Sequence, residues 1–165
     1  MNIKGHEIGG VMRDYIVWSD KEINGFFGGY RYLSNFHECP VYYEGIMYPS
    51  TENAFMAAKT LDRDERLQFV HISPKEAKAL GRTIKLRPDW NEVRVEVMYA
   101  VIFDKFYRNK GIRRWLLETG DKLLVEGNHW KDTFWGVCEG EGENMLGKIL
   151  MQIREDFKFI NSYGN

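Results

Sequence analysis

The sequence predicts a single domain of the α+β class, mostly helical with a small β hairpin or sheet. Helix-capping signals and apolar residues at helical spacing recur through the later two thirds of the 165-residue chain. A glycine turn between two short runs rich in Tyr, Val and Ile predicts the hairpin. The composition is 44% hydrophobic and 15% aromatic, which suffices for a buried core and argues against disorder.

The first part of the chain carries the expected β structure. Residues 1–25 lack helical periodicity and are expected to form an N-terminal arm or an edge strand, ahead of the main domain at 26–160. Residues 41–48 predict a hairpin with Gly45 at its turn, because two β-prone runs flank a Glu-Gly pair.

Capping residues predict where the next helices begin and end. Ser50 is the expected N-cap of a helix over about 51–60. Ser73 opens a Ser-Pro-Lys-Glu capping box, and Gly81 is the natural end of that helix. Both helices are therefore expected from local signals alone.

The later helices are expected from the same kinds of signal. Asp89 is the expected N-cap of the longest helix, which should end near 109–111. A short helix closed by Gly120 and a short strand over 122–126 should follow. A last helix is expected from an apolar stripe at helical spacing, formed by Leu146, Ile149, Leu150, Ile153 and Phe157.

Charge and cysteine usage exclude several classes of protein. The net charge is −1, with 23 basic and 24 acidic residues, so the basic excess of a duplex-DNA binder is absent. Two cysteines are too few for a disulfide framework or a Cys-rich zinc site, and the four histidines lack metal-ligand spacing. No apolar run has the length of a signal peptide or membrane span. We expect a cytoplasmic protein without metal or redox cofactor.

The segment 28–36 is the first candidate for ligand binding. Its glycines permit close approach of backbone to a ligand, and Arg31 is suited to a phosphate. Ser34 and Asn35 carry short polar groups suited to ribose hydroxyls or a base edge, beside the aromatic Phe36. The alternative is an ordinary aromatic loop packed on the core.

The predicted helix over 51–60 places a carboxylate and an ammonium on one face. Glu52, Phe55, Met56 and Lys59 stand at i, i+3, i+4 and i+7. That face suits a pocket in which an aromatic ring supports a base or ribose while charged groups act on it. Alternatively, Glu52 only stabilises the helix N-terminus and Lys59 extends to water.

The longest predicted helix carries a lysine inside its apolar stripe. Lys105 follows Met98 at i+7, and Arg94 lies one turn before Met98 near the same face. Because burying an unpaired ammonium is costly, Lys105 should reach the rim, pair with a carboxylate or face a cavity. The first of these, an ordinary extended lysine, is the common case.

The late loop offers a second carboxylate beside a tryptophan. Asp132 and Trp135, followed by Gly136, could combine charge with a stacking surface. The run at 139–144 is glycine-rich, but its three glutamates would repel a phosphate. We therefore expect it, with Asn144, to bind sugar hydroxyls or water instead.

Several of these segments together resemble the YbiA-like family, also called NADAR (NAD and ADP-ribose associated). The matching residues run in order from about 26 to 157: Leu33–Phe36, Gly45, Tyr48–Glu52, Phe55, Lys59, Ala77, Lys78, Gly81, Arg82, Trp90, Arg94, Met98, Lys105, Phe106, Leu117, Thr119, Gly120, Leu124–Glu126, Asp132, Trp135, Gly136, Asn144, Leu146, Gly147, Leu150, Met151 and Arg154. Relatives often carry His where this chain has Asn53, and a lysine where it has Arg94.

The resemblance implies a YbiA-like fold and N-glycosidase activity. One branch of the family resembles enzymes that cleave phosphoribosylamino-pyrimidine intermediates of riboflavin synthesis, and another removes ADP-ribose from guanine in nucleic acid. In both, ribose C1 is joined to an exocyclic nitrogen of a base. The alternative is a non-catalytic module that binds ADP-ribose or NAD.

The chemistry of such a bond assigns expected roles. Positive charge develops on the sugar, so Glu52 and Asp132 are expected to stabilise it or to activate water. Lys59, or else Lys105, is expected to form a Schiff base with the opened ribose. The remaining candidates bind substrate: Arg31, with Arg82 or Arg94, at phosphate; Ser34, Asn35 and Asn144 at hydroxyls; and Phe36, Phe55, Trp135 and Gly136 at the base or ribose.

Overall fold

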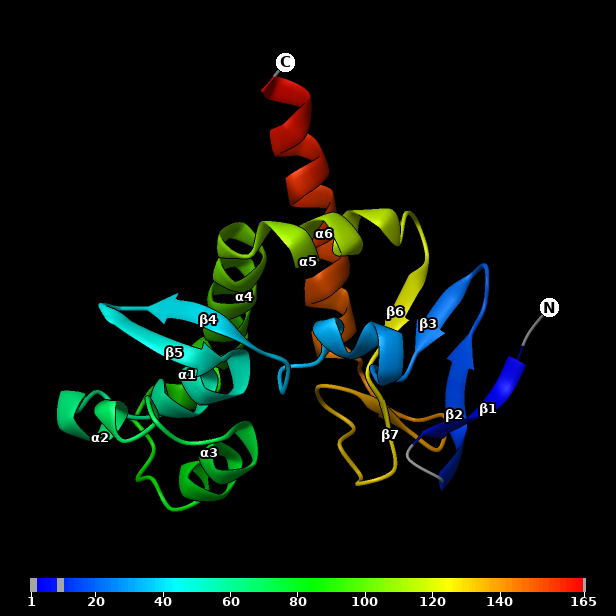
Figure 1. Ribbon diagram of the computed structural model, residues 1–165. Coiled ribbons are helices and arrows are strands. Elements are labelled where there is room, and N and C mark those ends of the chain that lie inside the picture. The colour runs from blue at the N-terminus through cyan, green and yellow to red at the C-terminus, as the bar shows by residue number, and fades with distance from the viewer. Residues whose placement is uncertain (1–2, 9–10, 165) are drawn as a thin grey trace. The chain divides into compact units, whose positions relative to one another are not determined.

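The described residues, 3–8 and 11–164 of a computed structural model, form two compact units (Figure 1). The first unit falls within residues 1–34 and 114–165, and the second contains residues 35–113. Each unit therefore brings together its own set of candidate residues, and each is described by itself.

The first unit is built on a four-stranded sheet. Its strands follow the order β1 (Ile3–Ile8), β2 (Val11–Trp18), β3 (Glu22–Asn24) and β6 (Leu123–Val125). The first three strands are antiparallel, whereas β6 joins β3 in parallel register with Ile23 beside Leu124. Both of these side chains are fully buried and form part of the core beneath α6 (Met145–Tyr163), which packs against β6 (Figure 1).

Short elements complete the first unit. A 3₁₀ helix, η1 (Gly28–Leu33), follows β3. The helix α5 (Lys110–Glu118) begins in the second unit and leads into the first. A two-stranded parallel pair, β7 (Gly127–Asn128) and β8 (Val137–Cys138), encloses the late loop that carries Asp132 and Trp135.

The N-terminal segment contributes strands to the sheet of the first unit. The expectation of an arm or edge strand over residues 1–25 includes residues 1–2 and 9–10, which lie outside the described residues. Among the others, β1 is the outermost strand of the sheet and β2 lies inside it. The boundary between residues 25 and 26 stays a prediction.

The second unit consists of a hairpin and four helices. The hairpin pairs β4 (Glu38–Tyr43) with β5 (Ile46–Ser50), and the turn at Glu44 and Gly45 has φ of 43° and 88°. The left-handed conformation at Gly45 explains the glycine there. The helices are α1 (Thr51–Ala57), α2 (Arg63–Leu67), α3 (Pro74–Gly81) and α4 (Trp90–Arg108).

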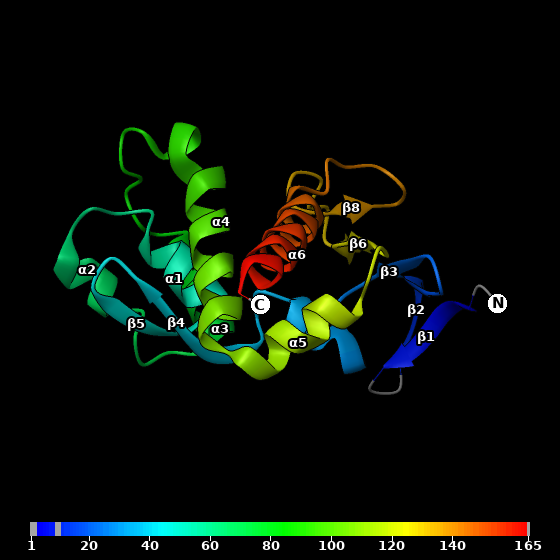
Figure 2. The same ribbon diagram turned by 90° about the horizontal axis from the view of Figure 1, so that it is seen from above.

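The helix α1 lies at the centre of the second unit. It contacts β4, β5, α2, α3 and α4. Figure 2, seen from above, shows it between α2 and α4. All seven of its residues are buried. Charged groups on α1 are therefore held by several neighbouring elements, which restricts where they can point.

Three local predictions are confirmed and two need correction. The Ser50 side chain accepts a hydrogen bond from the amide of Asn53, and Ser73 forms the complete capping box. The long helix begins at Trp90, but Asp89 does not cap it, because its carboxylate accepts 2.6 and 3.0 Å hydrogen bonds from the Arg87 guanidinium instead. The first helix ends at Ala57 rather than near residue 60, since the amides of Lys59 and Thr60 bond three residues back in a tighter turn.

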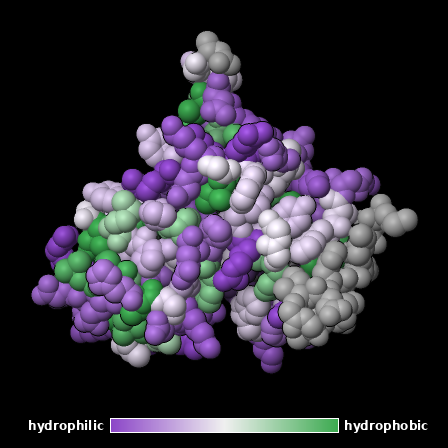
Figure 3. Space-filling view, in the orientation of Figure 1, coloured by the Kyte–Doolittle hydropathy of each residue, from purple (hydrophilic) through white to green (hydrophobic). Residues whose placement is uncertain are grey.

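The surface carries apolar side chains in a few places. Green atoms near the top of Figure 3 mark the outer end of α6, where Phe159 and Ile160 are exposed. Within the described residues, no helix combines the length and the apolar composition that a membrane span requires.

Candidate functional site

Three charged residues on α1 and just after the ends of α1 and α3 come together in the second unit, and we call them the α1 cluster: Glu52, Lys59 and Arg82. Glu52 lies in the first turn of α1 and is only 6% exposed. Lys59 follows the end of α1, and Arg82 is the C-cap of α3. The charges of Glu52 and of Arg82 both affect the pKa of Lys59, so the structure adds Arg82 to the pair that the sequence had placed on one helix face.

The ammonium of Lys59 is anchored on the backbone of α3. Its Nζ donates a 3.3 Å hydrogen bond to the carbonyl oxygen of Gly81. Gly81 itself packs tightly on α1, since a Cβ there would overlap the Met56 side chain and come within 2.9 Å of its Cγ. The absence of a side chain at Gly81 therefore allows α3 to approach α1 closely enough to hold Lys59.

The electrostatic surroundings of Lys59 change its titration. Burial lowers its pKa, Glu52 partly opposes this because it stabilises the ammonium, and Arg82 adds to the lowering by repulsion. A larger fraction of Lys59 is therefore the neutral amine at a given pH than for a lysine in water. A neutral amine is the nucleophilic form.

Aromatic rings accompany the α1 cluster. Phe55, from the buried face of α1, lies against Trp90 of α4 with ring centroids 5.0 Å apart. Phe36 lies 5.7 Å from the Nζ of Lys78, which approaches its ring face as a cation. The sequence singled out both phenylalanines but not Trp90 or Lys78 as their partners, because those contacts cross between elements.

Asn35 presents an unused acceptor beside α1. Its carbonyl oxygen accepts a 3.0 Å hydrogen bond from the amide of Glu52, which ties the loop before β4 to the start of α1. Its side-chain nitrogen lies 3.5 Å from the Met98 sulfur. The side-chain oxygen is buried and has no hydrogen-bond partner within the described part of the chain. A buried acceptor of this kind suits a hydroxyl donor from a ligand.

Asn53, where relatives often carry His, has a structural task in this chain. Its side-chain nitrogen donates 2.8 Å hydrogen bonds to the carbonyl oxygens of Phe69 and Ile72. Its side-chain oxygen accepts from the Ser50 hydroxyl. The amide thus joins the start of α1 to the segment between α2 and α3, and it is fully buried.

The other candidate lysine has different surroundings. Lys105, on α4, is only 1% exposed, and its Nζ lies 5.2 Å from the ring of Phe106. Its charge lowers the pKa of the Cys39 thiol, although burial has the larger and opposite effect on that group. Lys105 therefore faces the hairpin strand β4, whereas Lys59 faces Glu52 and Arg82. Arg94 is half-buried on α4.

The late loop of the first unit is held by its own polar groups. The Asp132 carboxylate accepts a 2.9 Å hydrogen bond from the amide of Trp135, and Asn128 bonds to both the amide and the carbonyl of Asp132. Gly136 has no room for a side chain, because a Cβ would overlap the Glu126 carbonyl oxygen and approach the Asn128 side chain to 2.6 Å. Asp132 and Trp135 are half-buried, so each keeps part of its side chain accessible.

Asn144 supports the loop rather than presenting free polar atoms. It has φ of 53° at the start of α6 and is 9% exposed. Its side-chain oxygen accepts from the amide of Glu126, and its nitrogen donates to the carbonyl of Leu124, at 3.0 and 2.9 Å. This pairing gives Asn144 an observed role as a brace between β6 and α6.

The remaining sequence candidates lie near η1. Arg31 is exposed within η1, and Ser34 is the half-buried residue that follows it, with its amide bonded to the Arg31 carbonyl. Both belong to the first unit, together with Asp132, Trp135, Gly136 and Asn144. The expected convergence of Glu52 and Asp132 on one sugar carbon stays a prediction. No group of three or more His, Cys, Asp or Glu side chains in the ranges 3–8 and 11–164 is placed to hold a metal ion.

Comparisons with known proteins match most of the chain. A family model described as the NADAR domain matches residues 20–158. The chain is 34% identical over 161 residues to the N-glycosidase YbiA of Escherichia coli, covering 94% of this chain and 96% of that protein. An N-glycosidase of Nostoc punctiforme is 36% identical over 140 residues, covering 81% and 89% of the two chains.

A longer relative and a solved structure extend the comparison. A riboflavin biosynthesis protein of Vibrio vulnificus is 38% identical over 133 residues, or 77% of this chain, which spans only 35% of that protein. The NMR structure of the E. coli protein YbiA superposes with a TM-score of 0.77 at 33% identity, covering 90% of this chain and 92% of that one. The predicted α+β, YbiA-like fold is thereby confirmed.

Proposed function

The chain belongs to the NADAR domain family, and we propose that it hydrolyses the bond between C1 of a ribose and an exocyclic amino nitrogen of a base. Its class, a hydrolase of N-glycosyl compounds, is that of the curated N-glycosidases it matches over most of their length. The bond cleaved and the residues that act on it are the proposal. One observation carries it: the buried carboxylate of Glu52 lies near the half-buried Lys59 and stabilises its ammonium form against the effect of burial.

Glu52 is proposed to stabilise the charged sugar. Opening of the ribose ring and exchange of the amine at C1 pass through iminium-like states with positive charge on C1 and its nitrogen, and a nearby carboxylate stabilises that charge most effectively where water is excluded. Glu52 is 6% exposed, and its backbone is fixed through Asn35. The free side-chain oxygen of Asn35 is proposed to accept a hydrogen bond from a ribose hydroxyl.

Lys59 is proposed as the nucleophile. A ribose on an exocyclic amine can open while still attached, which leaves C1 double-bonded to the base nitrogen. The neutral amine of Lys59 adds to C1, and the base nitrogen takes a proton and leaves with the electrons of its bond to C1. Water then hydrolyses the lysine–ribose imine, which releases the sugar and restores the amine. The lowered pKa of Lys59 supports this role, because it increases the reactive neutral fraction.

Residues of the first unit are also proposed to act in the reaction. Asp132 would act as the second carboxylate and Trp135 as the stacking surface, on a loop that Asn128 and Gly136 hold in shape. Arg31, together with Arg82 or Arg94, is proposed to bind phosphate, and Ser34 a hydroxyl. Phe36 and Phe55 would contact the base or ribose. Asn144 would act indirectly, because its bonds to Glu126 and Leu124 hold the late loop in place.

The proposed substrate is a small phosphoribosylamino-pyrimidine. The riboflavin biosynthesis protein among the relatives and the net charge of −1 both favour a small molecule over a nucleic-acid strand. The second candidate is ADP-ribosylated guanine, which has the same type of bond. A non-catalytic module that binds ADP-ribose is the alternative from another class, and the buried Glu52 favours the enzyme over it.

The test offers both substrates to the purified chain and follows release of free base by chromatography. We expect turnover of the pyrimidine riboside, and about two to four orders of magnitude less in Glu52→Gln, with an unchanged thermal unfolding midpoint. Glu96→Gln, which removes an exposed carboxylate of α4, is the matched control and should keep full turnover. Absence of release from either substrate, with ADP-ribose still bound, would instead support the binding module.

A further inference from the structure

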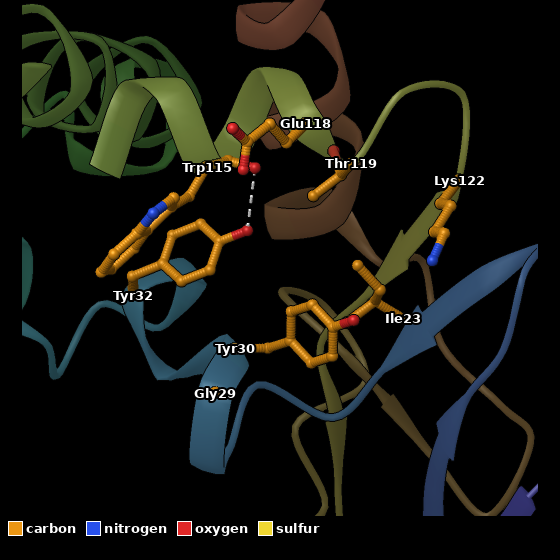
Figure 4. A pocket seen from close by; sticks show the side chains of 8 residues that line it. All are labelled: Ile23, Gly29, Tyr30, Tyr32, Trp115, Glu118, Thr119 and Lys122. Atoms are coloured by element: carbon orange, nitrogen blue, oxygen red, sulfur yellow. Dashed lines mark hydrogen bonds between the residues drawn. The ribbon is translucent and has the colours of Figure 1, made fainter. Parts of the chain in front are cut away.

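A cavity in the first unit is lined by none of the residues proposed for the reaction. Its volume is about 330 Å³, and it opens between β3, η1 and the end of α5 (Figure 4). The side chains that matter for its chemistry are Tyr30, Tyr32, Trp115, Glu118, Thr119 and Lys122. A volume of this size falls in the range of pockets that bind small organic ligands.

One wall of the cavity consists of fixed aromatic rings. Tyr32 is 5% exposed, meets Trp115 edge to face at 5.4 Å, and donates a 3.1 Å hydrogen bond to its carbonyl oxygen. Tyr30 meets Trp18 edge to face, with ring centroids 5.2 Å apart. Trp115 remains 51% exposed, so much of its ring surface is available to a ligand. The rings are therefore positioned before any ligand arrives.

The opposite wall is held by a buried arginine. Arg154 is 4% exposed, and its Nη1 donates hydrogen bonds of 2.9 Å to the Thr119 hydroxyl and 2.8 Å to the Lys122 carbonyl. The Thr119 hydroxyl in turn donates to the carbonyl of Leu116 at 2.6 Å. Arg154 thus joins α6 to the end of α5 and to the turn before β6, which fixes the backbone that carries Lys122.

Two opposite charges border the cavity. Figure 4 shows Glu118 on α5, on the side of Trp115, and Lys122 across the cavity beside Ile23. Burial raises the pKa of the Tyr32 hydroxyl most, Tyr30 and Glu118 raise it further and Arg154 lowers it, so the net effect is a raised pKa and a neutral hydroxyl. The Glu118 carboxylate already accepts a 3.0 Å hydrogen bond from Nε of Arg114 and keeps further lone pairs for an amino group of a ligand, and the Lys122 ammonium can donate to a carbonyl oxygen.

We propose that this cavity binds a planar nitrogen heterocycle of the nucleobase class, stacked on Trp115, with an amino group toward Glu118 and a carbonyl oxygen toward Lys122. Aromatic rings beside a carboxylate also suit a simple organic cation, but the ammonium of Lys122 opposes one. An isolated anion is opposed by Glu118. A heterocycle with a donor and an acceptor on different edges satisfies both charges, and its flat face suits the rings.

The experiment is a calorimetric titration of the full chain with guanosine, and with inosine, which lacks the amino group. We expect guanosine to bind in a saturable way and to bind about tenfold more weakly to Trp115→Ala, because one stacking surface is lost. Trp130→Ala removes another exposed tryptophan of the same unit that does not line the cavity, and it should leave binding unchanged. Glu52→Gln should also bind normally, which separates this site from the proposed reaction.

The proposed contacts of Glu118 and Lys122 are tested by comparing the affinities for guanosine and inosine. Glu118→Gln should weaken guanosine several-fold and leave inosine unchanged, whereas Lys122→Met should weaken both. An affinity for guanosine that Trp115→Ala leaves unchanged would overturn the proposal, because the heterocycle would then bind elsewhere. Choline that binds more tightly than guanosine, and loses affinity in Trp115→Ala, would overturn it in favour of a cation site.

Discussion

Two lysines of the second unit lie in contrasting surroundings. Lys105, on the packed face of α4, is almost completely buried against Phe106, and its charge lowers the pKa of the Cys39 thiol, against the larger effect of burial. Lys59, just after α1, is half-buried and donates a hydrogen bond to the Gly81 carbonyl. Burial lowers its pKa, Glu52 raises it and Arg82 lowers it. Burial alone therefore does not mark a reactive lysine. The neighbouring charges and the partial exposure of Lys59 are the reasons for proposing it, rather than Lys105, as the nucleophile.

The largest expected effect separates these two lysines directly. Borohydride added during turnover should trap a reduced ribose adduct on Lys59, located by mass spectrometry of peptides. Lys59→Ala should lose the adduct and about two to four orders of magnitude of turnover. Lys105→Met should keep the adduct, and Lys75→Ala, an exposed lysine of α3, is the control. An adduct recovered on Lys105 would reverse the assignment.

The next effect tests the late loop of the first unit. Asp132→Asn keeps an oxygen that can accept from the Trp135 amide but removes the charge, so turnover should fall about a hundredfold with little change in stability. Asp132→Ala removes the acceptor as well and should also lower the free energy of unfolding by about 1 kcal/mol. Steady-state kinetics measure the loss of turnover, and denaturant unfolding measures the loss of stability. Normal turnover in Asp132→Asn would exclude the proposed carboxylate role.

A smaller effect tests how closely α3 packs on α1 at Gly81. Gly81→Ala places a methyl group against Met56, so we expect a loss of about 1 to 3 kcal/mol in the free energy of unfolding. Gly111→Ala, at a glycine with no neighbour within 4 Å of the added carbon, should be neutral or slightly stabilising. Equal stability of the two variants in thermal unfolding would show that the packing of α3 on α1 tolerates a side chain.

The smallest expected effect is on the pH dependence. Arg82 lowers the pKa of Lys59, so Arg82→Gln should raise it and reduce the neutral fraction. The rise of turnover with pH should then move to higher pH, with a rate at neutral pH roughly two- to fivefold lower, as expected for an exposed charge. Arg82→Lys retains the charge and should retain the profile. A shift toward lower pH would contradict the proposed role of the neutral amine.

Local signals in the sequence determined most element boundaries. Ser50, Gly45 and the capping box at Ser73 act through bonds to residues only a few positions away, so their effect does not depend on the rest of the fold. Where a local signal met a competitor, the prediction failed, as at Asp89, whose carboxylate binds Arg87. The five-residue helix α2 was missed, because one turn and a half leaves too little periodicity to recognise.

The sequence by itself determined the family, the fold class and the residue types available for the chemistry, because these follow from motifs read in order along the chain. Only the tertiary structure decided which of those residues lie close together. The approach of Arg82 to Lys59, the bond from Lys59 to Gly81 and the brace at Asn144 all join segments that are distant in sequence. Such contacts depend on how helices and strands pack, and packing is a property of the whole unit rather than of any one segment.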